Sequence, residues 1–136
     1  MLVENLIMTL NATTGATLAV ATQTTAIADV PTTAISADGT TTATPSVNDI
    51  FVIAHGGYTH TIAGFQAGDK LRFSFTASLN VLRDTDQADG SQSFTASDPN
   101  SGATTTIILT GITADQDNAL FNVPSINNVF GSGTIA

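Results

Sequence analysis

The chain has 136 residues, and 42% of them are apolar, so it can bury the core of one domain. Eleven acidic residues stand against three basic ones, and a net charge of −8 excludes the basic patch needed to bind nucleic acid or an anionic membrane. Only 10% of the residues are charged, against about 25% in an average protein, so uncharged polar side chains must cover most of the surface.

Residues 1–47 are rich in Thr and Ala and contain no aromatic residue. Apolar side chains recur there at even positions, which predicts strands beginning near Glu4 and Ala16: Leu2, Leu6, Met8, Leu10, Leu18 and Val20. Two interpretations remain open. The segment is either a disordered Thr-rich linker, or an arm that becomes ordered by pairing with a strand of a neighbouring copy.

The start of the chain lacks the basic region of a secretory signal peptide. No apolar run approaches the ~18 residues that a membrane-spanning helix needs. We therefore expect no cleaved N-terminal signal and no membrane span. The chain also has no Cys, so disulfides are excluded.

The segment 48–75 carries the clearest strand pattern. The β-branched run Ile50–Ile53 is followed by Gly56-Gly57, which predicts a two-residue hairpin. Antiparallel pairing across this turn would place Phe51 opposite Ile62, with Ile53 on the same inward face.

A third strand follows, in which Leu71, Phe73 and Phe75 alternate with polar residues. The segment thus predicts three consecutive strands that share one apolar face.

This segment resembles the module that closes the calcium β-roll in repeats-in-toxin (RTX) proteins, which are exported by type I secretion. The matching positions are Asp49, Phe51, Val52, Thr61, Ile62, Phe65, Gly68, Asp69 and Leu71. A looser similarity extends to the end of the chain, but the tandem G-G-x-G-x-D nonapeptides of the β-roll are absent. The resemblance implies export through an uncleaved C-terminal signal, and hence an extracellular or cell-surface location.

The remaining sequence predicts strands at 79–82, 91–96 and 104–110, with a turn at 98–102. The contiguous run Ile107–Leu109 suggests burial on both faces, which predicts either a central strand or one covered by the arm. Thr113 and Gln116 form a capping-box pattern for a helix over 114–121, which Pro124 is expected to end before a turn-like segment closed by Gly131. Apolar side chains of this region are expected to cover the open end of the sheets: Leu120, Phe121, Ile126, Val129 and Phe130.

Together these patterns predict an all-β fold. We expect an antiparallel, jelly-roll-like β-sandwich over residues 48–136 with one or two short C-terminal helices, preceded by a strand arm over 1–47 that contacts other subunits.

Aspartates give the sharpest chemical signal. Asp84, Asp86 and Asp89 precede Gly90 in a pattern like a calcium loop with one residue inserted, and an exposed acidic turn explains the same residues. Asp69 is a further candidate ligand. Asp115 and Asp117 fit a helix-dipole role at least as well as ligation.

No catalytic group is evident. His55 and His60 flank the predicted hairpin turn without Cys or Glu nearby to complete a zinc site, and we interpret them as packing residues. There is no G-x-S-x-G elbow and no phosphate-binding loop. We therefore expect no enzyme activity.

Two functions remain. The first is a secreted structural protein that assembles with itself by strand addition into a filament, biofilm matrix fibre or surface layer, stabilised by calcium. The alternative is a monomeric calcium-dependent adhesin or glycan-binding module with a cell-surface polysaccharide as partner. One Tyr and no Trp offer little surface for stacking on sugars. An ice-binding Thr face would need a regular T-x-T repeat, which is missing.

Overall fold

The computed structural model describes residues 2–5, 23–26, 29–82 and 89–135. The described chain is mostly β, with two short helices. Its strands are β1 (Leu2–Asn5), β2 (Gln23–Ala26), β3 (Thr32–Ile35), β4 (Gly39–Thr42), β5 (Ile50–Ile53), β6 (Thr59–Ala63), β7 (Lys70–Phe73), β8 (Ser78–Leu82), β9 (Ser91–Ser97) and β10 (Thr104–Thr110). The helices are α1 (Ala114–Ala119) and α2 (Val123–Phe130).

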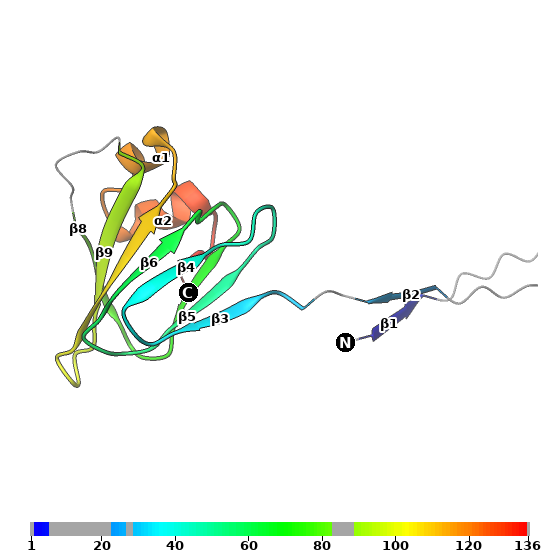
Figure 1. The fold of residues 1–136 in the computed structure, drawn as a ribbon, viewed down its shortest axis with the longest axis horizontal. Helices are drawn as coiled ribbons and strands as arrows, with labels where there is room; N and C mark the ends of the chain where they lie inside the picture. Colours follow the sequence, from blue (N-terminus) through cyan, green and yellow to red (C-terminus); the bar gives the residue numbers. More distant parts are fainter. Residues whose placement is uncertain (1, 6–22, 27–28, 83–88, 136) are drawn as a thin grey trace, which may run out of the picture.

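Two sheets form the body of the protein. One has five strands in the order β4-β6-β10-β9-β8, and the other has three in the order β3-β5-β7. The antiparallel pair β1–β2 lies outside this body, beyond the start of β3 (Figure 1). β1 coincides with the strand predicted near Glu4, whereas the one predicted near Ala16 falls outside the described residues.

From β3 to β7 the chain alternates between the two sheets and so winds as a coil. We call each turn of this coil, with its strands, a rung. Neighbouring rungs are parallel in both sheets. Thr32 pairs with Ile50 and Ile50 with Lys70, which sets successive rungs 18 and 20 residues apart. The prediction of antiparallel pairing is therefore wrong for this half of the body.

The second half, from β8 to β10, completes the larger sheet. β9 pairs antiparallel with both β8 and β10, and β10 lies parallel to β6. The central position predicted for 104–110 is confirmed, and Ile107 and Leu109 are buried while Ile108 is half-buried. The predicted turn is present as well, with Gly102 N–H donating to the Asp98 carbonyl oxygen at 2.8 Å.

The hairpin predicted at Gly56-Gly57 is wrong, because β5 and β6 lie in different sheets. Both glycines are described, and neither has the positive φ that a type I′ turn requires. Gly56 is needed for another reason: a Cβ there would lie 2.8 Å from the ring of Tyr58. The Tyr58 hydroxyl lies 2.9 Å from the carbonyl oxygen of Ile35 and 2.7 Å from that of Ala54, so this corner joins the two sheets.

The boundary predicted between arm and body at residue 47 also needs correction. β3 and β4 belong to the stretch 1–47, yet they pair with β5 and β6. Their few large apolar side chains gave no sign of this. They gain order by backbone pairing within the same chain, which supplies hydrogen bonds that side-chain composition does not reveal.

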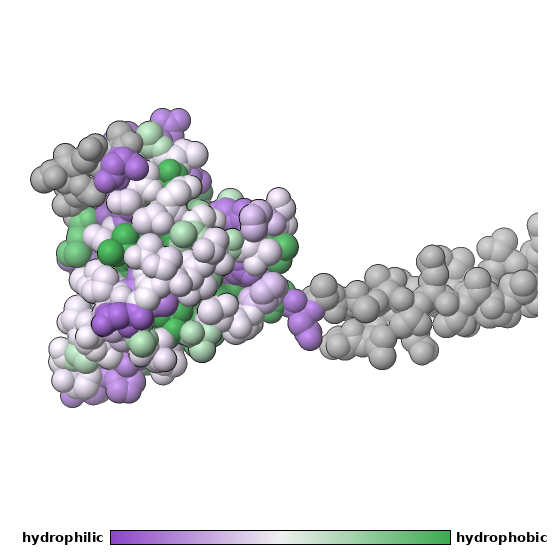
Figure 2. All heavy atoms as spheres, viewed as in Figure 1, coloured by the Kyte–Doolittle hydropathy of each residue, from purple (hydrophilic) through white to green (hydrophobic). Residues whose placement is uncertain are grey.

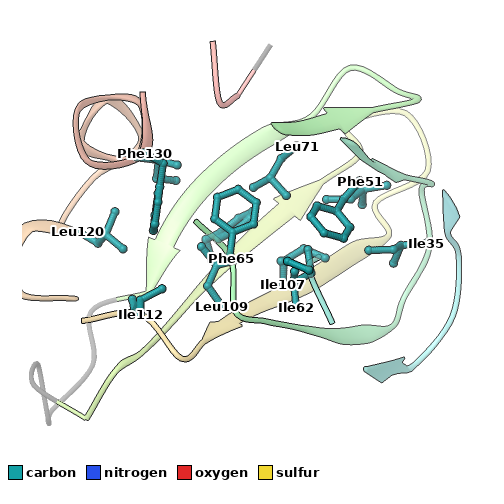
Figure 3. Close-up of a cluster of buried hydrophobic side chains, with 14 of the residues drawn as sticks. Ile35, Phe51, Ile62, Phe65, Leu71, Ile107, Leu109, Ile112, Leu120 and Phe130 are labelled. Atoms are coloured by element: carbon teal, nitrogen blue, oxygen red, sulfur yellow. The ribbon is translucent and has the colours of Figure 1, made fainter. Parts of the chain in front are cut away.

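Both sheets contribute to one hydrophobic core (Figure 3). The predicted inward positions Phe51, Ile53 and Ile62 are confirmed, each with at most 1% of its surface exposed. The ring centroids of Phe65 and Phe130 are 4.9 Å apart with the rings perpendicular, a favourable edge-to-face contact. The helices are thereby packed onto the strand core.

The two helices close one end of the body. Thr113 and Gln116 form the predicted capping box of α1, which ends at Ala119 instead of Phe121. The segment expected to be turn-like is helix α2, because Asn122 caps it and Pro124 stands in its first turn, where a missing N–H is harmless.

Most of the predicted covering residues are confirmed in place. Leu120, Ile126 and Phe130 are buried, and Val129 packs against the core. Phe121 is an exception, since 64% of its surface is exposed between the helices. Beyond α2, Ile135 forms a single parallel bridge with Leu71 at the edge of β7.

These two phenylalanines provide a matched test of the core. Phe130→Ala should lower the free energy of unfolding by about 3–5 kcal/mol, because it leaves a cavity beside Phe65. Phe121→Ala, the same change at an exposed site, should alter it by about 0.5 kcal/mol or less. Chemical denaturation followed by circular dichroism measures both, and equal effects would contradict the packing described.

Candidate functional site: an aspartate corner and an open rung

The predicted calcium residues are divided between regions of the structure. Asp84 and Asp86 lie in 83–88, outside the described residues. Asp89 is exposed, and its carboxylate accepts the Ser91 N–H at 2.8 Å in a turn that begins β9. Asp69 is buried at the start of β7. Within the described ranges, no group of three or more His, Asp or Glu side chains is arranged to hold a metal ion.

Asp69 belongs instead to a corner of the coil that we call the aspartate corner, made of Asp49, Asp69 and Gln66. Asp49 and Asp69 immediately precede β5 and β7, and both are buried. The two oxygens of Asp69 accept the Asp49 N–H at 2.9 Å and the Gln66 N–H at 3.0 Å. Asp49 in turn accepts the Thr44 N–H at 2.5 Å. These bonds join three successive segments at the coil edge.

Gln66 and Gly68 complete this corner. The side-chain amide of Gln66 donates to the carbonyl oxygens of Thr44 and Val47 at 2.9 and 2.8 Å. Gly68 has a φ of 99°, and any Cβ there would collide with the side chain of Asn48. The Gly-Asp pair of the motif is thus explained by the shape of the corner.

The electrostatics of the corner follow from its burial. Removal from water raises the pKa of Asp69, the two N–H bonds oppose this shift, and the nearby charge of Asp49 adds to it. The folded protein therefore holds this proton to a higher pH than the unfolded chain does.

The histidines serve packing, as far as the described contacts show. His60 is buried, with Nδ1 2.9 Å from the Ala37 carbonyl oxygen and Nε2 2.9 Å from the Thr41 hydroxyl. It therefore fastens β4 onto β6. His55 is exposed, and its ring lies edge-on to Phe75 at 6.3 Å.

The first rung of the coil, β3 and β4, is open on its outer side, and we call it the open rung. In β3, the Ile35 carbonyl oxygen accepts the Ala54 N–H at 2.9 Å, so the odd-numbered residues face β5. In a parallel pair, alternate residues direct both backbone groups to the same side. The N–H and C=O groups of Thr32 and Ala34 therefore point away from the sheet.

β4 repeats this arrangement in the other sheet. Ala43 N–H donates to the Ala63 carbonyl oxygen at 2.9 Å, so the backbone groups of Thr40 and Thr42 point outward. Both threonines are exposed, and no other described strand pairs with β4 on this side.

The open rung carries no charged residue in either strand. Natural proteins protect edge strands with Lys, Pro, bulges or covering segments. The face drawn in Figure 2 fits this picture, since residues of intermediate hydropathy dominate it and strongly hydrophilic ones are few. The sequence analysis did not identify the open rung as a site. The signal that could have found it is the spacing of 18 residues between Thr-rich β3 and the apolar strand β5.

No family model, curated protein or solved structure matched the chain. Among the described residues, neither helix is long and apolar enough to cross a bilayer.

Asp69→Asn tests the corner, because it turns an amide NH₂ toward a backbone N–H donor. We expect it to lower the free energy of unfolding by about 1–3 kcal/mol at neutral pH. The loss should be larger at acid pH and shrink as pH rises from 3.8, the ordinary pKa, through the raised pKa of folded Asp69. Urea unfolding of both proteins at several pH values measures this.

Asp115→Asn serves as the control for this series. Its carboxylate is exposed in the first turn of α1, and the change should cost less than about 1 kcal/mol. A loss at Asp69 that grows with rising pH would show that burial does not govern this carboxyl.

Proposed function

We propose that the protein is a secreted structural protein that assembles with itself by β-strand addition, forming an extracellular filament, matrix fibre or surface layer. One observation carries the proposal: the open rung presents unpaired, uncharged backbone edges in both sheets at the same end of the body. Such edges are templates for pairing with another chain.

The two ends of the coil differ, which supports directional assembly. At the far end, the last rung is covered: Leu71 N–H donates to the Thr134 carbonyl oxygen at 2.7 Å, and Gly68 N–H to that of Phe130 at 3.0 Å. Coil and repeat proteins need caps at their ends to remain soluble single molecules. The coil thus has a cap at its β7 end and an open rung at its β3 end.

The arm supplies a candidate donor for β3. β1 and β2 form a two-stranded pair, which is marginally stable on its own in water. β2 ends at Ala26, close in sequence to the start of β3 at Thr32. We propose that the arm of one copy pairs with the open rung of another, because this would satisfy backbone groups of both.

The coil also supports two further proposals, that the fold is a β-sandwich and that the protein is exported by type I secretion. Two sheets that face each other across one core suit a β-sandwich, and we extend the proposal to that description. Parallel coils are the architecture that calcium-binding nonapeptide repeats build, which supports the RTX resemblance although those repeats are absent. On the basis of this resemblance, we propose that the protein is exported to the cell exterior by type I secretion.

Calcium remains part of the proposal through Asp84, Asp86 and Asp89. If these residues form a calcium loop, added Ca²⁺ should raise the melting temperature, and the triple change to Asn should abolish that rise. Mg²⁺ serves as the control ion, because its octahedral demand fits such a loop poorly. Equal shifts of the melting temperature with both ions, or no shift with Ca²⁺, would show that these residues form an exposed acidic turn and not a calcium site.

Charging the open rung tests assembly directly. The double change Ala34→Lys and Thr40→Lys should suppress polymers, because Lys on an edge strand disfavours pairing with another chain. Sedimentation and negative-stain electron microscopy at high protein concentration measure the loss.

A matched control is Asn100→Lys combined with Ser101→Lys, in the exposed turn before β10. It adds the same charge away from the rung and should assemble normally. An unaltered protein that stays monomeric with and without Ca²⁺ would contradict assembly and favour the monomeric glycan-binding module.

A further inference from the structure

We infer that the strand that completes β4 is β8 of a second copy, so that the five-stranded sheet continues from one molecule into the next. The inference rests on the proposed function and names the partner surface of its open rung. It is carried by the directions, faces and composition of the two edge strands of this sheet.

Strand direction is the first condition, and the sheet meets it. β4 runs parallel to β6, and β6 parallel to β10. β9 is antiparallel to β10, and β8 is antiparallel to β9. β8 therefore runs in the same direction as β4, at the opposite edge. A second molecule in the same orientation can place its β8 beside β4 as one more parallel strand.

The side-chain faces also match. In β8, Leu79 and Val81 lie opposite the buried Ala96 and Phe94, so they occupy the core face. In β4, that face is occupied by Thr41, whose partner Ile62 is buried. A junction of β4 with β8 thus sets small and apolar side chains together on the inner side of the sheet.

The outer face of the junction would be polar. Thr40 and Thr42 of β4 are exposed, as are Ser78, Asn80 and Leu82 of β8. These residues would form one continuous outer row of uncharged and mostly polar side chains.

Neither of these two edge strands is protected by a charge or a proline within its described residues. β8, like β4, has no charged residue and no proline, and among the described strands none pairs with its outer side. Two such edges on one molecule, alike in direction and different in sequence, make a heterologous contact. Contacts of this kind propagate as a fibre unless the rotation between copies closes a ring.

The arm is the competing occupant of β4. Its two described strands already pair with each other, whereas the outer side of β8 pairs with no described strand. A pair of strands of four or five residues buries little surface, whereas a stable interface buries roughly 1,000 Å² or more. The β4–β8 contact is therefore weak by itself, and it needs either high concentration or the arm to hold the copies together.

Complementary blocking variants test this inference. Thr40→Lys blocks β4 and leaves β8 intact, whereas Asn80→Lys blocks β8 and leaves β4 intact. Each alone should lose the polymers of the unaltered protein, while their equimolar mixture should form a dimer from the two intact edges. Analytical ultracentrifugation at high concentration should then show a species of twice the monomer mass. Circular dichroism must show that both variants fold.

The outcomes separate the inference from the proposed function. If Asn80→Lys assembles normally while Thr40→Lys does not, another strand fills β4; the inference is wrong and assembly stands. If both variants are monomeric and their mixture is too, the two edges do not meet, and the inference is again wrong. If the unaltered protein does not assemble at all, the proposed function itself fails.

Cysteine pairs give a second readout that does not depend on the lysine variants. The chain has no Cys, so a Thr40→Cys protein mixed with an Asn80→Cys protein can form only introduced disulfides. Neighbouring strands bring Cβ atoms within the range that a disulfide bridges. Mild oxidation should give mixed dimers, whereas Asn100→Cys mixed with Asn80→Cys should not. Equal yields in both mixtures would overturn the inference.

Discussion

Each strand of the coil depends on the rung beside it for its backbone hydrogen bonds. The strands from β3 to β7 are only four or five residues long, so none can be stable alone. Pairing in two sheets at once satisfies the inner rungs on both sides. The same rule leaves the outermost rung half satisfied. An open edge is therefore a direct consequence of this way of building a body.

The corners decide whether the rungs stay in register. Short parallel strands with uncharged side chains have little sequence to specify their alignment. The aspartate corner supplies that specification on one side, since the carboxylate that precedes one rung accepts the backbone N–H that precedes the rung before it. On the other side, His60 fastens Thr41 and the chain before β4. Buried polar groups that are fully hydrogen-bonded give unique positions in this way.

The two ends of the coil differ in how they are covered. Helix α2 and the last residues use apolar side chains and backbone bonds to cover the rung that ends in β7. The first rung has only Thr, Ala, Ile and Gly, and no element of the described body lies over it. The first rung also carries no charge, so a strand that paired with it would meet no cost of ion desolvation there. The arm then leaves the body from the open end.

Local patterns in the sequence determined the strands from β5 to β10, the inward residues and the first helix. Alternation placed Phe51, Ile53 and Ile62 correctly in the core, because the period of two depends only on the strand itself. The capping box of α1 was likewise readable, since its bonds lie within four residues. Helix α2 was missed because Pro124 reads as a stop unless Asn122 is recognised as the cap.

Tertiary structure alone decided which strands are neighbours. The face of β5 is the same whether it pairs with β6 or with β3 and β7, so the hydrophobic pattern does not distinguish a hairpin from a coil. The role of Asp69 was also hidden, because its partners Asp49 and Gln66 meet only when rungs stack. Short-range periodicity records burial, whereas partners 18 to 20 residues apart are chosen by the packing of the whole body.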